Sequence, residues 1–273
     1  MAFLAAAGVA AAPSLSEAAI AGHAAPAAVP ALPTRLRPSL ALLETGVPPL
    51  VPLAGRTLNV SAEDQIVLNP HEVIITFDDG PTAKYTGKIL KILDSYGIKA
   101  TFMMVGRMAE VHPEAAQAVA LAGETIGTHT YDHPNLAKLD PAAAIAEVQH
   151  GQAAVASVLA PVNAAPTPFF RFPYLATTWA LTATLTMDGT IPLGVQIDSD
   201  DYFKDTPKAT LQHLLARLDH EGRGIVLFHD IHPKTVTVLP LFLEALAERG
   251  YSVVQLVDKA PSPFAEPVQT AGR

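Results

Sequence analysis

Short apolar runs alternate with amphipathic segments over the greater part of the chain, beginning at residue 73. The first run, VIITF at 73–77, combines β-branched and aromatic residues without polar interruption, which is typical of a strand buried on both faces. Similar runs predict further strands at 100–105, 125–128, 169–171, 191–197, 224–228 and 252–256.

Helical periodicity separates these runs. Within 85–96 the apolar residues fall on one face of a helix, and Gly97 follows as a natural C-terminal stop. Pro113 and Pro141 suit the first turns of two later helices, and Asp140 suits the N-cap of the second. The pattern predicts helices at 85–96, 113–122, 141–159, 178–187, 208–220 and 238–249.

Seven strands that alternate with helices predict an α/β fold with a parallel sheet. The pattern leaves open whether the sheet is an incomplete barrel or an open, doubly wound sheet. Both architectures place reactive residues just beyond the C-terminal ends of the strands.

The N-terminal region differs in composition from the rest. Residues 3–12 form an apolar run followed by small residues at 19–21, so 1–25 is expected to be a signal peptide, or alternatively a disordered tail, because no Lys or Arg precedes Arg35. The run is too short for a transmembrane segment. We expect an Ala/Pro-rich linker or arm at 26–69, a catalytic domain at 70–260 and a C-terminal tail at 261–273, with the protein secreted or periplasmic.

Composition excludes several function classes. A formal charge of −8 over 273 residues, without a basic block, argues against a nucleic-acid partner. The absence of cysteine excludes disulfides, thiolate metal sites and cysteine nucleophiles. Ten histidines leave imidazole and carboxylate groups as the candidate metal ligands.

Five polar clusters follow predicted strands. Because the carboxyl ends of parallel strands meet at one face, we expect these clusters to share a single site. They read TFDDG at 76–80, HTYDH at 129–133, RFPY at 171–174, DSDDY at 198–202 and LFHD at 227–230.

Two of the clusters suggest metal binding. His129 and His133 can point at one ion, with a carboxylate from elsewhere completing the set. Asp78 and Asp79 would repel each other at a buried strand end unless a cation neutralised one of them. The alternatives are surface or helix-capping histidines and a solvated turn with an Asx cap.

Taken in order, the five clusters resemble the signature motifs of the polysaccharide deacetylase family, carbohydrate esterase family 4. The resemblance covers residues 70–258, and TFDDG followed by HTYDHP is its most specific part. It implies a distorted (β/α)7-type barrel of parallel strands.

The resemblance also implies a metal-dependent hydrolytic site. Asp79, His129 and His133 would hold a divalent ion, usually Zn²⁺ and sometimes Co²⁺ or Ni²⁺. Asp78 would be the general base toward water, and the backbone N–H of Tyr174 would help to stabilise the oxyanion.

The remaining family roles concern the leaving group and the acetyl pocket. The resemblance implies His229 as the general acid, Asp201 as the residue that orients it, and Arg171 as the partner of Asp78. Leu227 would contact the acetyl methyl group. His232, three residues after His229, could be a further ligand, but we interpret it as a rim residue.

The fourth motif departs from the family pattern. It ends in Tyr202 where the family usually has Trp, so a smaller phenol ring would line the acetyl pocket and change its shape. Its acids are also duplicated, and we align Asp201 rather than Asp200 with the histidine partner.

The sequence therefore predicts an N-deacetylase acting on an acetylated glycan such as peptidoglycan, a chitin-like polymer or an exopolysaccharide. Alternatives are an O-acetyl esterase on xylan or another glycan, hydrolysis of a small cyclic amide, and a glycan-binding module without activity. The sequence leaves the polymer, the metal and the oligomeric state open.

Overall fold

The computed structural model describes residues 53–259. The predictions for 1–25, for 26–52 and for the C-terminal tail at 261–273 lie outside these residues. The strands are β1 Ala54–Val60, β2 Glu72–Asp78, β3 Thr101–Met104, β4 Thr125–Thr128, β5 Phe169–Phe170, β6 Ile191–Pro192, β7 Ile197–Asp198, β8 Gly224–His229 and β9 Ser252–Asp258. The helices are α2 Thr86–Ser95, α3 Gly106–Val111, α4 Pro113–Leu121, α5 Pro141–Leu159, α6 Trp179–Met187, α7 Pro207–Glu221 and α8 Pro233–Glu248.

Seven of the strands form an incomplete barrel. They pair in the order β7-β8-β2-β3-β4-β5-β6, and every pairing is parallel. Within 53–259 no pairing joins β6 to β7, so the ring stays open there. The predicted α/β class with a distorted barrel of parallel strands is confirmed.

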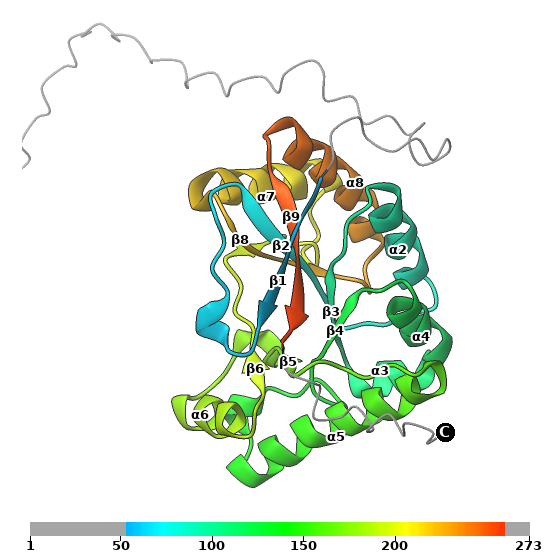
Figure 1. Ribbon diagram of the computed structural model, residues 1–273, viewed down its shortest axis with the longest axis vertical. Helices are drawn as coiled ribbons and strands as arrows, with labels where there is room; N and C mark the ends of the chain where they lie inside the picture. The colour runs from blue at the N-terminus through cyan, green and yellow to red at the C-terminus, as the bar shows by residue number, and fades with distance from the viewer. Residues whose placement is uncertain (1–52, 260–273) are drawn as a thin grey trace, which may run out of the picture. The chain divides into compact units, whose positions relative to one another are not determined.

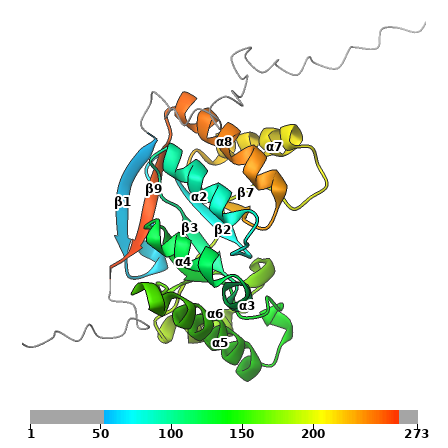
Figure 2. The ribbon, with the colours of Figure 1, turned by 90° about the vertical axis from the view of Figure 1, so that its right-hand side faces the viewer.

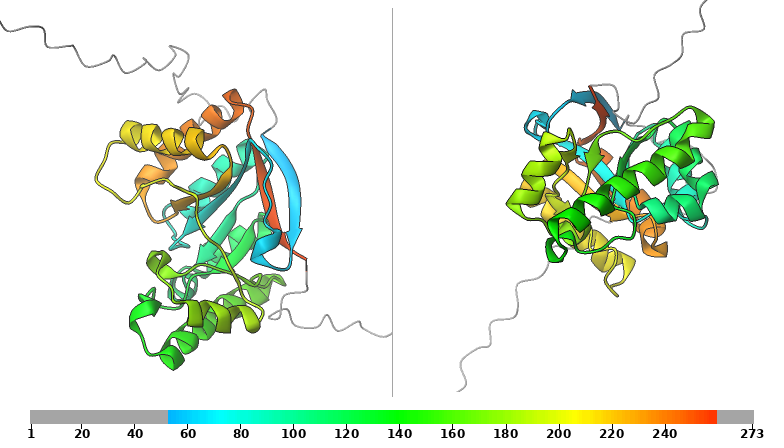
Figure 3. Two further views of the ribbon diagram at one scale, coloured as in Figure 1. Left: turned by 90° about the vertical axis from the view of Figure 1, so that its left-hand side faces the viewer. Right: turned by 90° about the horizontal axis from the view of Figure 1, so that it is seen from below.

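Two further strands extend the sheet beside the barrel. β1 pairs with β9 along its length, and the start of β9 pairs with the start of β2. β1 and β9 lie at the front in the view of Figure 1, and Figure 2 and the left view of Figure 3 show them side by side at one side of the sheet.

Hydrophobic burial explains why these segments form these elements. All seven residues of β2 are buried, and the strand lies between β3 and β8 at the centre of the fold. One apolar cluster fills the space between the sheet and helices α2, α4, α5, α7 and α8, which lie outside the sheet in Figure 2. A second cluster, including Ile74, Met103 and Phe169, lies on the opposite face of the strands.

The predicted capping residues have the expected contacts. Asp140 accepts a hydrogen bond from the N–H of Ala142 at 3.0 Å and so caps α5, and Pro141 occupies the first turn of that helix. Pro113 likewise begins α4.

The structure differs from the sequence prediction in four places. Helix α8 begins at Pro233, five residues before the predicted start at 238, because Pro233 occupies its first turn. Residues 54–60 form β1, although the linker or arm was predicted to reach residue 69; its alternating TLNV pattern is short and follows a Pro-rich stretch. The predicted strand 191–197 is two strands, β6 and β7, and this interruption is the gap in the barrel. Helix α3 was not predicted because it spans only six residues.

Candidate active site

The carboxyl ends of the barrel strands meet around one cavity of about 470 Å³. The cavity is lined by residues of all five polar clusters, which confirms that parallel strands bring these distant segments together. The lining comprises Asp78, Asp79, His129, His133, Phe172, Tyr174, Leu175, Asp198, Tyr202, Leu227 and His229.

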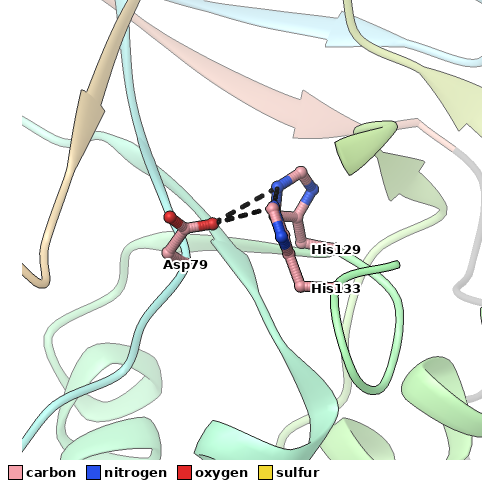
Figure 4. Close-up of side chains that lie close together, drawn as sticks. All are labelled: Asp79, His129 and His133. Carbon is pink, nitrogen blue, oxygen red and sulfur yellow. Dashed lines mark hydrogen bonds and ion pairs between the residues drawn. The ribbon is translucent and has the colours of Figure 1, made fainter. Parts of the chain in front are cut away.

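Asp79, His129 and His133 form a compact trio at one side of this cavity. Their ligand atoms all lie within 4.8 Å of one another. Asp79 Oδ1 is 3.5 Å from His129 Nε2 and 3.2 Å from His133 Nε2. Figure 4 shows the Asp79 carboxylate facing both imidazole rings. Asp79 Oδ1 is also buried without a hydrogen-bond partner. A buried carboxylate oxygen with no donor, facing two imidazoles, fits a divalent cation.

A backbone contact fixes how His129 presents its nitrogens. His129 Nδ1 lies 2.7 Å from the carbonyl oxygen of Arg171, which can only accept, so Nδ1 carries the proton and Nε2 presents a lone pair. Burial lowers the pKa of His129, although Asp78 and Asp79 act in the opposite direction. The neutral ring is the form that binds metals.

The loop that carries the two histidines is held tightly against two helices. The N–H groups of Gly106 and Arg107 donate to the carbonyls of Thr130 and Tyr131 at 2.9 and 3.1 Å. On α5, a Cβ atom at Gly151 would lie 2.3 Å from the carbonyl carbon of Thr130. Only glycine allows this approach, so α5 takes part in placing the trio.

Asp78 lies next to the trio but has a different partner. Its Oδ1 accepts a hydrogen bond from Arg171 Nη1 at 2.7 Å, while Oδ2 lies 3.8 Å from His129 Nε2. Arg171 is fully buried, and it also donates to Thr76 Oγ1 and to the carbonyls of Leu193 and Gly194. The guanidinium therefore fixes one carboxylate oxygen of Asp78 and leaves the other facing the cavity.

His229 and Asp201 form a second hydrogen-bonded pair in the site. His229 Nδ1 lies 2.7 Å from Asp201 Oδ1, and Asp201 Oδ2 accepts from the His229 N–H and from Thr235 Oγ1. Burial by itself lowers the pKa of His229, but the hydrogen bond and charge of Asp201 and the charges of Asp78 and Asp79 raise it to about 9. The imidazole is therefore protonated at neutral pH.

The duplicated acids of the fourth motif have separate partners. Asp201 contacts His229, whereas Asp200 forms an ion pair with Arg217 on α7 at 2.7 Å. His232 lies at the N-cap of α8, with its ring centre 5.9 Å from that of His229.

Three predicted substrate contacts line the remaining wall. Tyr174 has φ 59°, an unusual value for a residue other than glycine, and its ring packs edge-on to His133. Over the described chain, no hydrogen bond engages the Tyr174 N–H. Leu227 is buried behind the cavity, and the ring of Tyr202 stands edge-on to His229 at 5.3 Å.

The structure also brings in residues to which the sequence assigned no role. Asp198 lines the cavity, and Thr235 supports Asp201 from α8. Asp230 is buried under the DDG turn, where it accepts from Thr86 Oγ1, and burial raises its pKa to about 7. Asp198 and Asp230 stand in motifs that the sequence singled out, whereas nothing in the sequence pattern distinguishes Thr235.

Comparison with known proteins identifies the family. The polysaccharide deacetylase family model matches residues 66–188. A chitin deacetylase of Pestalotiopsis sp is 32% identical over 214 residues, which are 75% of this chain and 69% of that protein. The chain belongs to the polysaccharide deacetylase family. The predicted resemblance and the prediction of a polysaccharide deacetylase are confirmed.

Other polysaccharide deacetylases share the sequence and the fold. A chitooligosaccharide deacetylase of Azorhizobium caulinodans is 28% identical over 208 residues, which cover 70% of this chain and 96% of that protein. The solved peptidoglycan deacetylase Bd3279 of Bdellovibrio bacteriovorus is 35% identical, with a TM-score of 0.67. That match covers 79% of this chain but only 61% of the Bdellovibrio chain.

Proposed function

We propose that the protein hydrolyses N-acetyl groups on an amino-sugar polymer or oligomer, releases acetate, and uses a divalent cation to do so. The observation that carries this proposal is the meeting of three groups in one cavity. They are the Asp79, His129 and His133 trio, the Asp78 carboxylate and the His229 imidazole. Its relatives named as chitin, chitooligosaccharide and peptidoglycan deacetylases support the substrate class.

The trio would hold the cation. When bound, a divalent cation lowers the pKa of water and polarises an acetyl carbonyl. One carboxylate and two neutral imidazoles, with no thiolate, suit Zn²⁺, and Co²⁺ and Ni²⁺ are compatible with the same donors.

The residues around the trio would handle the protons. Asp78, with one oxygen held by Arg171, would accept a proton from the attacking water through its free oxygen. The Tyr174 N–H would donate to the oxygen that becomes negatively charged on the acetyl group. His229, kept protonated by Asp201, would donate a proton to the nitrogen as the C–N bond breaks.

Acetate release tests the proposal. Purified protein is assayed side by side on chito-oligomers, peptidoglycan and acetylated xylan, with and without a chelator. We expect acetate from an N-acetylated substrate, loss of activity with the chelator, and recovery with Zn²⁺ or Co²⁺. Full activity in protein shown to be metal-free by elemental analysis would refute the metal site, and release from xylan alone would favour an O-acetyl esterase.

We also propose export of the protein, since large acetylated glycans lie outside the cytoplasm. No helix within 53–259 is long and apolar enough to cross a membrane. Cell fractionation and N-terminal sequencing test the proposal: a mature terminus near residues 20–26 would support it, and an intact Met1 on cytoplasmic protein would contradict it.

A further inference from the structure

Different groups border the histidines of the cavity. The ring of Tyr174 packs edge-on to His133, whereas the ring of Tyr202 packs edge-on to His229. Asp198 also lines the cavity and is paired with the apolar Leu227 of the neighbouring strand. The reaction proposed above gives Asp198 no role, although it ends strand β7 at the cavity and is only half-buried.

Asp198 and Tyr202 are joined by a hydrogen bond. The Tyr202 hydroxyl donates to Asp198 Oδ2 at 3.0 Å, with Asp200 Oδ1 at 3.4 Å. Burial, together with the charges of these two carboxylates, raises the pKa of Tyr202, so the phenol stays protonated. With its proton directed at Asp198, the phenol oxygen offers the cavity only lone pairs.

The carboxylates of Asp198 and Asp200 are not both neutralised by a positively charged partner. Arg217 pairs with Asp200 through its side chain, but toward Asp198 it donates only to the backbone carbonyl. Among residues 53–259 no ion pair involves the Asp198 carboxylate, whose Oδ1 accepts from the Asp200 N–H at 3.0 Å. This part of the cavity therefore combines hydrogen-bond acceptors with a net negative charge.

We infer that Asp198 and Tyr202 form a recognition site for the hydroxyl groups of a neutral N-acetylated sugar and that they select against sugars carrying a carboxylate. The inference rests on the proposed function. It narrows the preferred substrate residue to N-acetylglucosamine rather than N-acetylmuramic acid.

The chemistry of the two sugars supports this selection. An N-acetylglucosamine residue within a chain has a free hydroxyl at C3, beside the N-acetyl group, and a hydroxyl can donate to carboxylate and phenol oxygens. In N-acetylmuramic acid the neighbouring hydroxyl is replaced by an ether that ends in a carboxylate. That sugar loses a donor and brings a like charge toward Asp198, and both effects oppose binding.

Kinetics of the full-length chain on two oligomers tests the inference. The substrates are tetra-N-acetylchitotetraose and a peptide-free glycan of alternating N-acetylglucosamine and N-acetylmuramic acid, with mass spectrometry locating the residue that loses acetate. We expect wild type to deacetylate glucosamine residues preferentially. Asp198→Asn should raise KM for the chito-oligomer about tenfold through loss of a charged hydrogen bond, and it should weaken the discrimination against muramic acid.

Two further variants separate recognition from general damage. Tyr202→Phe removes the phenol oxygen but keeps the ring, so KM for the chito-oligomer should rise several-fold with a smaller effect on kcat. Asp188→Asn removes the same charge from an exposed position away from the cavity lining, and the ratio of the two substrates should not change.

The outcomes distinguish this inference from the proposed function. If wild type releases no acetate from either oligomer, the proposed function fails. If wild type is active but removes acetate equally well from both sugars, or if Asp198→Asn leaves their ratio unchanged, the recognition site is overturned and deacetylation stands.

Discussion

Adjacent residues can have unrelated functions when their side chains have different partners. Asp78 and Asp79 are consecutive, yet Asp78 contacts a buried arginine while Asp79 faces two imidazoles. Asp79 has φ 74°, and this left-handed backbone conformation separates the directions of the two carboxylates.

Substitutions should separate the two carboxylates. Asp79→Ala removes one of three ligands, so it should lose both metal and activity. Asp78→Asn should retain the metal but lose at least about 10²-fold in kcat, because an amide cannot accept the proton. Metal content by elemental analysis, alongside acetate release, checks both expectations. Equal metal loss in the two variants would make Asp78 a ligand.

His229 should matter more for an amide than for an activated ester. An amine leaves only if it is protonated, whereas an electron-poor phenolate leaves with little help. We expect His229→Ala to cost roughly 10²-fold or more on an N-acetylated oligosaccharide and about tenfold or less on an aryl acetate. Equal losses on the two substrates would point to a structural role, and retained amide hydrolysis would point to another acid, with His232 the next candidate.

The pH profile should report the contact between His229 and Asp201. Because His229 must be protonated to act as an acid, kcat should fall as the pH rises through its pKa, which is raised to about 9. Asp201→Asn removes the negative charge that favours the imidazolium, so the alkaline limb should move to lower pH. A bound cation affects the wild type and Asp201→Asn equally. The measurement is therefore the difference between the pH profiles of kcat of these two proteins. If the alkaline limb of the profile did not move, His229 would be excluded as the group whose titration produces it.

At the scale of elements, helix packing determines the position of the loop that carries His129 and His133, the proposed metal ligands. Gly106 on α3 and Gly151 on α5 approach so closely that a Cβ on Gly106 would lie 2.9 Å from the Cα of Gly151. The loop with Thr130 and Tyr131 lies against this contact and is hydrogen-bonded to the start of α3.

Gly151→Ala should therefore displace the loop that carries His129 and His133. A methyl group 2.3 Å from Thr130 forces α5 or the loop to move, and we expect a loss of about 1–3 kcal/mol in the free energy of unfolding and weaker metal binding. Gly87→Ala is the control: it lies in helix α2 with no atom within 4 Å of the added carbon, and it should gain roughly 0.5–1 kcal/mol. Urea denaturation and metal titration measure both quantities. Unimpaired metal binding in Gly151→Ala would contradict the role of α5.

At the scale of the molecule, the metal should stabilise the fold because its ligands come from two segments. Asp79 follows β2, whereas His129 and His133 follow β4, so unfolding separates them. A cation at about 100 times its Kd contributes about 2.7 kcal/mol, which corresponds to roughly 5–10 °C in Tm. Thermal unfolding with Zn²⁺ and with chelator should show this difference. Asp79→Ala should show almost none, and an equal response in that variant would place the metal elsewhere.

The sequence by itself determined the α/β class, the parallel strands and the common site. Continuous apolar runs such as 73–77 report a strand buried on both faces, and polar residues at the ends of such strands must gather at one edge. The family resemblance supplied the role expected for each residue, including the choice of Asp201 over Asp200. Both sets of inferences depend on local patterns, which can be read along the chain.

Only the tertiary structure decided which side chains share hydrogen bonds and which elements border the site. The contacts of Arg171 with Asp78, of Asp198 with Tyr202, and of Gly151 with Thr130 join residues whose spacing follows no local period. The gap between β6 and β7 and the addition of β1 beside β9 likewise result from pairings between distant segments. Such contacts depend on how the elements pack closely together in three dimensions, and local patterns along the chain do not specify this packing.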